Sequence, residues 1–216
     1  MKFSFWADRD AVEAVEPGYL AFHHFDSTHI ALLALAAVII FCAVLIFRRL
    51  STAGRNRFFA VLTVLLLLDE FAKYAIAIGT NSWSWSYLPL HLCSINIFVC
   101  LAYTLTKKDL LAEFLYSLCL PGAVVALIVP TWNDLPILNG MHLHSASVHI
   151  MLVMYPVLIL ANGFCPSFRR LPKILCMLAA VFGEKYFFLG LPLLLIIIWT
   201  LMYIPWALAA RKKAKA

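Results

Sequence analysis

The sequence predicts an all-α polytopic membrane protein, a bundle of about seven transmembrane helices. Hydrophobic residues make up 64% of the 216 residues, charged residues only 13%, and the mean hydropathy is +0.91. A soluble globular protein is about half apolar and a quarter charged. The composition therefore argues against a soluble enzyme, a disordered chain and a nucleic-acid-binding domain. Since one crossing takes about 20 residues, the length leaves room for six or seven helices and little else.

Apolar runs separated by polar or basic breaks supply these helices. They lie at residues 28–47, 58–78, 88–107, 110–129, 141–162, 173–188 and 191–210. Pro89 suits the first turn of the third helix, Pro121 predicts a kink in the fourth, and Asn162-Gly163 is a typical C-terminal cap for the fifth. The sixth run is interrupted at Gly183, so we expect a short sixth helix and a full seventh.

The basic residues predict the orientation of the bundle. Most of the 17 Lys and Arg residues follow the first, third, fifth and seventh helices. Because basic loops stay in the cytoplasm, we expect the N-terminus outside and the C-terminus inside. The chain then divides into an extracytoplasmic segment (residues 1–27), one transmembrane domain (28–210) and a basic cytoplasmic tail (211–216). The acidic N-terminal segment does not resemble a cleavable signal peptide.

Three charged residues interrupt the second predicted helix: Asp69, Glu70 and Lys73. Ionisable side chains within a bilayer are costly and are functional candidates for that reason. Asp69 and Lys73 are four residues apart, so we expect them to pair along one helix face. Glu70 must then face the bundle interior, be protonated, or meet a group on another helix.

All seven histidines fall on the outer side of the predicted bundle, and we expect the three nearest the N-terminus (His23, His24 and His29) to be solvated. Cys93 lies roughly 8 Å below the outer end of the third helix and His149 roughly 12 Å below that of the fifth, at 1.5 Å per residue. Asn96 shares the helix face of Cys93, and Ser145 that of His149. Two polar stripes at similar depth predict a cavity open to the outer leaflet.

A cysteine beside a histidine can form a thiolate that attacks an acyl carbonyl and becomes a thioester. At this depth the available acyl groups are the esters of phospholipids. Ser145, Asp69 or Glu70 would orient the histidine, as the third member of a catalytic triad does. His91 and Asn96 would stabilise the oxyanion. This mechanism requires no metal, nucleotide or other cofactor, and none of the six cysteines forms a CxxC pair.

The segment LPLHLCSINIF (residues 88–98), followed by IMLVMYP (150–156) and YIPW (203–206), resembles the bacterial YwaF-type membrane proteins. These are relatives of the eukaryotic transmembrane protein 164 acyltransferases. The resemblance implies acyl transfer between phospholipid and lysophospholipid through a cysteine thioester, in a multi-pass protein of the bacterial cytoplasmic membrane. By position it places the nucleophile on Cys93 and its histidine on His149. More distant relatives, the androgen-induced lipid hydrolases, use threonine as the nucleophile. Glu184-Lys185-Tyr186 departs from the asparagine–tyrosine step expected before the last helix.

The sequence alone is also compatible with three other functions. An intramembrane hydrolase could use the same thiol, because water and an alcohol attack a thioester alike. A zinc hydrolase could use His91, Cys93, His142 and His149, all of which are zinc-compatible. A small transporter or binding protein could use the charges of the second helix as a relay.

Overall fold

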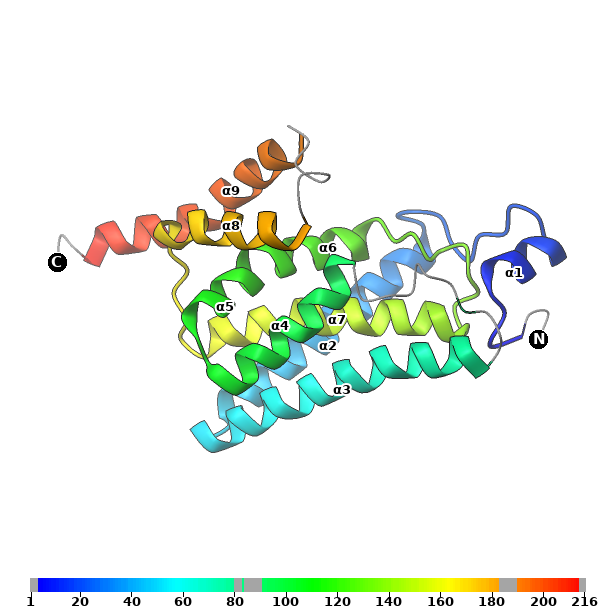
Figure 1. Ribbon diagram of the computed structural model, residues 1–216, viewed down its shortest axis with the longest axis horizontal. Coiled ribbons are helices and arrows are strands. Elements are labelled where there is room, and N and C mark those ends of the chain that lie inside the picture. The colour runs from blue at the N-terminus through cyan, green and yellow to red at the C-terminus, as the bar shows by residue number, and fades with distance from the viewer. Residues whose placement is uncertain (1–3, 80–82, 84–90, 183–189, 214–216) are drawn as a thin grey trace.

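The computed structural model describes residues 4–79, 83, 91–182 and 190–213, and every regular element within them is helical (Figure 1). This confirms the predicted all-α class. In chain order the elements are α1 (Arg9–Val15), α2 (Ser27–Arg49), α3 (Thr52–Gly79), α4 (Leu92–Thr106), α5 (Asp109–Phe114), a π-helical turn (Leu115–Cys119), α6 (Leu120–Ile128), α7 (Gly140–Ala161), a 3-10 turn (Phe168–Arg170), α8 (Leu171–Phe182) and α9 (Gly190–Lys213). α7 lies in the middle of the bundle and packs against α2, α3, α4 and α6. α1 and the end of α9 lie at opposite ends of the molecule (Figure 1).

Three of the described helical stretches are long and apolar enough to cross a membrane: α2, the continuous helix 109–128, and α7. α4 and the stretch Ile197–Ala209 of α9 are shorter apolar helices. The outer face of α2 exposes Ile30, Val38 and Phe41, each by more than half. Large exposed apolar faces of this kind are stable against lipid rather than water. The chain is a membrane protein.

α2 begins at Ser27, one residue before the predicted start of the first helix, and its N-terminus is capped by Asp26. Its carboxylate accepts hydrogen bonds from the backbone N–H groups of His29 at 2.8 Å and His23 at 2.9 Å. These bonds hold the pKa of Asp26 below its usual value, and the bond from His29 has the largest effect. The bond from His29 satisfies an N–H group that the first turn of α2 leaves without a partner.

α3 begins at Thr52, six residues before the predicted start at residue 58. Arg55 explains the difference. Its guanidinium donates to the carbonyl oxygens of Leu50 at 3.1 Å and Arg48 at 3.2 Å, which lie at the C-terminal end of α2. A basic side chain at a helix C-terminus is stabilising, so Arg55 and Arg57 lie in the first turns of α3 rather than in a loop between two helices.

The fourth predicted helix is irregular beside Pro121, as expected, and the irregularity is the π-helical turn Leu115–Cys119. Proline has no N–H to donate to the carbonyl one turn earlier, that of Ser117. The indole N–H of Trp199 in α9 donates to this carbonyl at 2.8 Å. The break in α5–α6 thus provides an anchor for α9.

α7 spans Gly140–Ala161, which confirms the predicted fifth helix and its Asn162-Gly163 cap, where Gly163 has φ +98°. At its start the side chain of Asn139 accepts from the N–H of Met141 at 2.9 Å. Gly140 lies against the N-terminal segment, and a Cβ there would come within 2.9 Å of the Trp6 ring. The N-terminal segment therefore packs on the end of α7.

α8 and α9 correspond to the predicted sixth and seventh helices, and the predicted stretch 183–188, including Glu184-Lys185-Tyr186, lies outside the described residues. They are held by Glu113, which is fully buried at the end of α5. Its carboxylate accepts from the Ser167 N–H and the Arg170 guanidinium, each at 3.1 Å, and from the Tyr203 hydroxyl. A buried carboxylate is tolerated only with such a complete set of partners.

Candidate active site

Cys93 is the second residue of α4, in the first turn of that helix. The sequence placed it about five residues into a helix that starts near Pro89, but the described helix begins at Leu92, after an extended His91 with φ −74° and ψ 147°. The first-turn N–H groups of a helix have no intrahelical acceptor and carry the positive end of the helix dipole.

His149 lies on α7, and its Nε2 atom is 3.0 Å from the Cys93 sulfur. The other ring nitrogen, Nδ1, is 2.6 Å from the carbonyl oxygen of Ser145. A carbonyl can only accept, so Nδ1 carries the proton and Nε2 presents its lone pair to the thiol. The two residues nominated from sequence therefore meet with the histidine in the tautomer of a general base.

Trp132, in the loop between α6 and α7, stacks on the imidazole of His149. The ring centroids are 4.8 Å apart and the planes are inclined by 22°. The indole is 7% exposed, so it shields one face of the imidazole. Nothing in the local sequence around Trp132 signals this contact, since it depends on the course of a loop.

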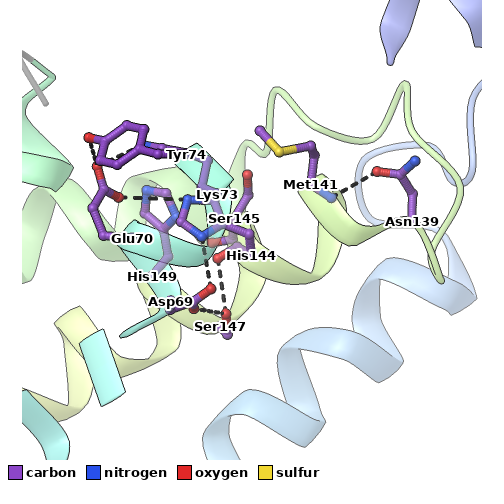
Figure 2. Close-up of polar contacts among 10 residues, drawn as sticks. All are labelled: Asp69, Glu70, Lys73, Tyr74, Asn139, Met141, His144, Ser145, Ser147 and His149. Carbon is purple, nitrogen blue, oxygen red and sulfur yellow. Dashed lines mark hydrogen bonds and ion pairs between the residues drawn. The ribbon is translucent and has the colours of Figure 1, made fainter. Parts of the chain in front are cut away.

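Neither Asp69 nor Glu70 is the acceptor for Nδ1 of His149, contrary to the expectation that one of them orients it. Asp69 accepts instead from Nδ1 of His144 at 2.9 Å and from the hydroxyl of Ser147 (Figure 2). His149 is oriented by the Ser145 carbonyl of its own helix, not by the Ser145 hydroxyl or an acidic side chain. The acidic residues connect α3 to α7 one helical turn from the imidazole.

Lys73 pairs with Glu70 rather than with Asp69. The Lys73 ammonium is 2.7 Å from the Glu70 carboxylate, which also accepts from the Tyr74 hydroxyl at 2.5 Å (Figure 2). The expected Asp69–Lys73 pair is wrong because Asp69 turns toward α7, where two donors meet it. Glu70 is 1% exposed and so faces the bundle interior, and it also meets a group on another helix, because Nε2 of His144 on α7 lies 3.8 Å from its carboxylate.

The two residues expected to stabilise an oxyanion differ in position. His91 is exposed and forms the N-terminal boundary of α4, without a side-chain capping bond to that helix. Asn96 is 3% exposed and lies one turn beyond Cys93, and its Oδ1 atom has no hydrogen-bond partner among the described residues. The backbone N–H groups of Leu92, Cys93 and Ser94 belong to the first turn of α4, the turn that carries the thiol.

The remaining histidines of interest are held elsewhere. His142 hydrogen-bonds the carbonyl of Leu135 at 3.0 Å through Nδ1. His29 is 2% exposed, not solvated as expected, because its Nε2 bonds the Leu127 carbonyl at 3.0 Å. Within the part of the chain that the structure describes, no three His, Cys, Asp or Glu side chains form a cluster that could hold a metal ion.

The fold and this site define a class: helical membrane proteins with a cysteine–histidine pair at a helix N-terminus. The TMEM164 family model matches residues 24–188, more than half of the chain. The protein belongs to the TMEM164 family, in agreement with the resemblance read from the PLHLC segment. A search of curated proteins gave no match. A search of solved structures also gave none.

Proposed function

We propose that this protein is a membrane-embedded phospholipid acyltransferase or transacylase that works through an acyl-thioester on Cys93. The observation that carries the proposal is the 3.0 Å contact between the Cys93 sulfur and Nε2 of His149. The family relationship and the membrane setting add support, because phospholipid esters are the acyl groups that a thiol within a bilayer meets.

The first half-reaction loads the cysteine. The thiol passes its proton to Nε2 of His149, and the thiolate attacks the ester carbonyl of a phospholipid. The tetrahedral intermediate then loses the glycerol oxygen, which takes the proton from His149 and departs as the hydroxyl of a lysophospholipid. The acyl group remains on the sulfur as a thioester.

The second half-reaction transfers the acyl group from Cys93 to the acceptor. The hydroxyl of an acceptor lysophospholipid gives its proton to His149 and attacks the thioester carbonyl. The carbon–sulfur bond breaks, and the sulfur regains a proton from His149. Water in place of the acceptor would release a fatty acid by the same steps, so the nature of the product separates transfer from hydrolysis.

The first turn of α4 supplies the electrostatic support for both steps. The first N–H groups of a helix, here those of Leu92, Cys93 and Ser94, have no acceptor within the helix itself. Donors fixed beside a developing oxyanion are the usual means of stabilising it. In this proposal they take the role that the sequence assigned to the side chains of His91 and Asn96.

The charges of α3 have a positioning role in this proposal rather than that of a transport relay. Asp69 bonds His144 and Ser147 on α7, and Glu70 bonds Lys73 and Tyr74. The bonds of Asp69 hold α3 against the helix that carries His149, whereas those of Glu70 to Lys73 and Tyr74 lie within α3. In the proposed topology, with seven spans, the N-terminus outside and the basic tail in the cytoplasm, Cys93 lies in the outer half of the membrane.

The test is acyl exchange between phospholipid vesicles and an isotopically labelled lysophospholipid, followed by mass spectrometry. We expect Cys93→Ala to lower the rate at least about a thousandfold, as removal of a nucleophile does. Cys42→Ala is the matched control, because Cys42 is exposed on α2, and it should keep the wild-type rate. Equal rates in wild type and Cys93→Ala would refute the proposal.

A further inference from the structure

A cavity of about 250 Å³ lies between α2, α7 and the loop that joins α6 to α7. Its walls are almost entirely apolar side chains. They include Leu32, Leu33, Ala36, Leu127, Ile137 and Ile150. An apolar void of this kind stays dry and takes up apolar molecules.

The polar side chains on the cavity wall are engaged elsewhere. His29 and His142 bond backbone carbonyls, each at 3.0 Å, and the Ser147 hydroxyl bonds Asp69. They therefore offer little to a polar ligand. Hydrocarbon is the occupant that this lining favours.

The cavity lies directly beside the cysteine–histidine pair. Trp132 forms part of its wall and also stacks on His149 at 4.8 Å. Ala146 and Ile150, which line it, flank His149 on α7. One aromatic ring thus separates the cavity from the imidazole.

The cavity also borders the lipid-facing surface. Leu35 and Leu143 contribute to its lining, and they are 55% and 42% exposed. These exposed side chains mark a side from which a hydrocarbon chain can enter from the bilayer.

We propose that this cavity binds the hydrocarbon tail of the acyl group that is transferred, in the lipid donor and in the thioester. The inference rests on the proposed function. The transferred chain is the assigned occupant because it stays attached to the reacting carbonyl through both half-reactions, whereas the acceptor can exchange with the membrane between them. A chain held there fixes the carbonyl relative to Cys93 and makes chain length a determinant of rate.

Ala36→Trp tests the assignment, because Ala36 is 4% exposed and its side chain lines the cavity. We expect it to lower the rate with palmitoyl donors relative to octanoyl donors by about tenfold, the loss that follows when about two methylenes are excluded. Ala37→Trp, on the exposed face of the same helix, should leave this ratio unchanged. Ala146→Leu should shift the ratio in the same direction as Ala36→Trp. An unchanged donor ratio in both cavity variants, or a shift with the chain of the acceptor instead, would overturn the inference.

A second measurement does not depend on turnover. A phospholipid with a diazirine at the end of its acyl chain is irradiated with Cys93→Ala protein, and the labelled residues are mapped. We expect labelling of 32–36 and of Ile150, reduced by Ala36→Trp. Labelling there without acyl exchange by the wild type would keep the cavity assignment and refute the proposed function. Acyl exchange by the wild type with labelling confined to other helices would keep the proposed function and refute the cavity assignment.

Discussion

His149 receives its orientation from the backbone of its own helix. A histidine usually needs a second-shell acceptor to fix its tautomer, and sequence reasoning sought that acceptor among acidic side chains. In α7 the Ser145 carbonyl, four residues earlier, performs this task at 2.6 Å. A backbone acceptor leaves no signature in residue identity, which is why the sequence pointed to Asp69 and Glu70 instead.

At the same scale, Trp132 fixes the plane of the imidazole by stacking. Trp132→Ala should lower kcat/KM for acyl exchange by about 2- to 12-fold, the equivalent of about 0.5–1.5 kcal/mol for an aromatic pair. Trp132→Phe keeps a stacked ring and should retain most of the rate. Equal losses in the Ala and Phe variants would show that stacking is not what Trp132 contributes.

Among the elements, the association of α8 and α9 with α5 depends on the buried Glu113. Arg170→Ala removes a 3.1 Å charged hydrogen bond to this carboxylate and should lower the free energy of unfolding in detergent by about 1.5–3 kcal/mol. The neighbouring Arg169 is exposed, and Arg169→Ala should change the free energy of unfolding by no more than about 0.5 kcal/mol. Chemical denaturation of the two variants measures the difference, and equal stabilities would contradict the role of Glu113.

The helices also show which parts of the fold can be predicted from a single sequence. Hydrophobic runs predicted α2 and α7 to within a residue or two, because long apolar helices are decided by composition. The start of α3 was placed too late, since Arg55 reads as a loop residue until the C-terminal carbonyls of α2 are present to bind it. Lys73 illustrates the same limit: both Asp69 and Glu70 are within its reach, and the donors of α7 decide the choice.

For the whole molecule, the proposed seven-span topology predicts on which side of the membrane each terminus and loop lies. Cys165 is exposed in the loop after α7, which the basic residues assign to the cytoplasm. In a variant whose other cysteines are replaced by serine, a membrane-impermeant maleimide should label Cys165 only after the cells are permeabilised. A variant with Glu13→Cys as its sole cysteine, whose position is also exposed, should be labelled in intact cells. The opposite pattern would invert the topology and place Cys93 in the inner half of the membrane.

The most direct test of the proposed chemistry is the intact mass of the purified protein after incubation with phospholipid. A fatty-acyl increment that neutral hydroxylamine removes, and that Cys93→Ala lacks, is the result that an acyl-thioester on Cys93 predicts. An increment of the same size that persists in Cys93→Ala would place the acyl group on another residue and contradict the assignment of the nucleophile.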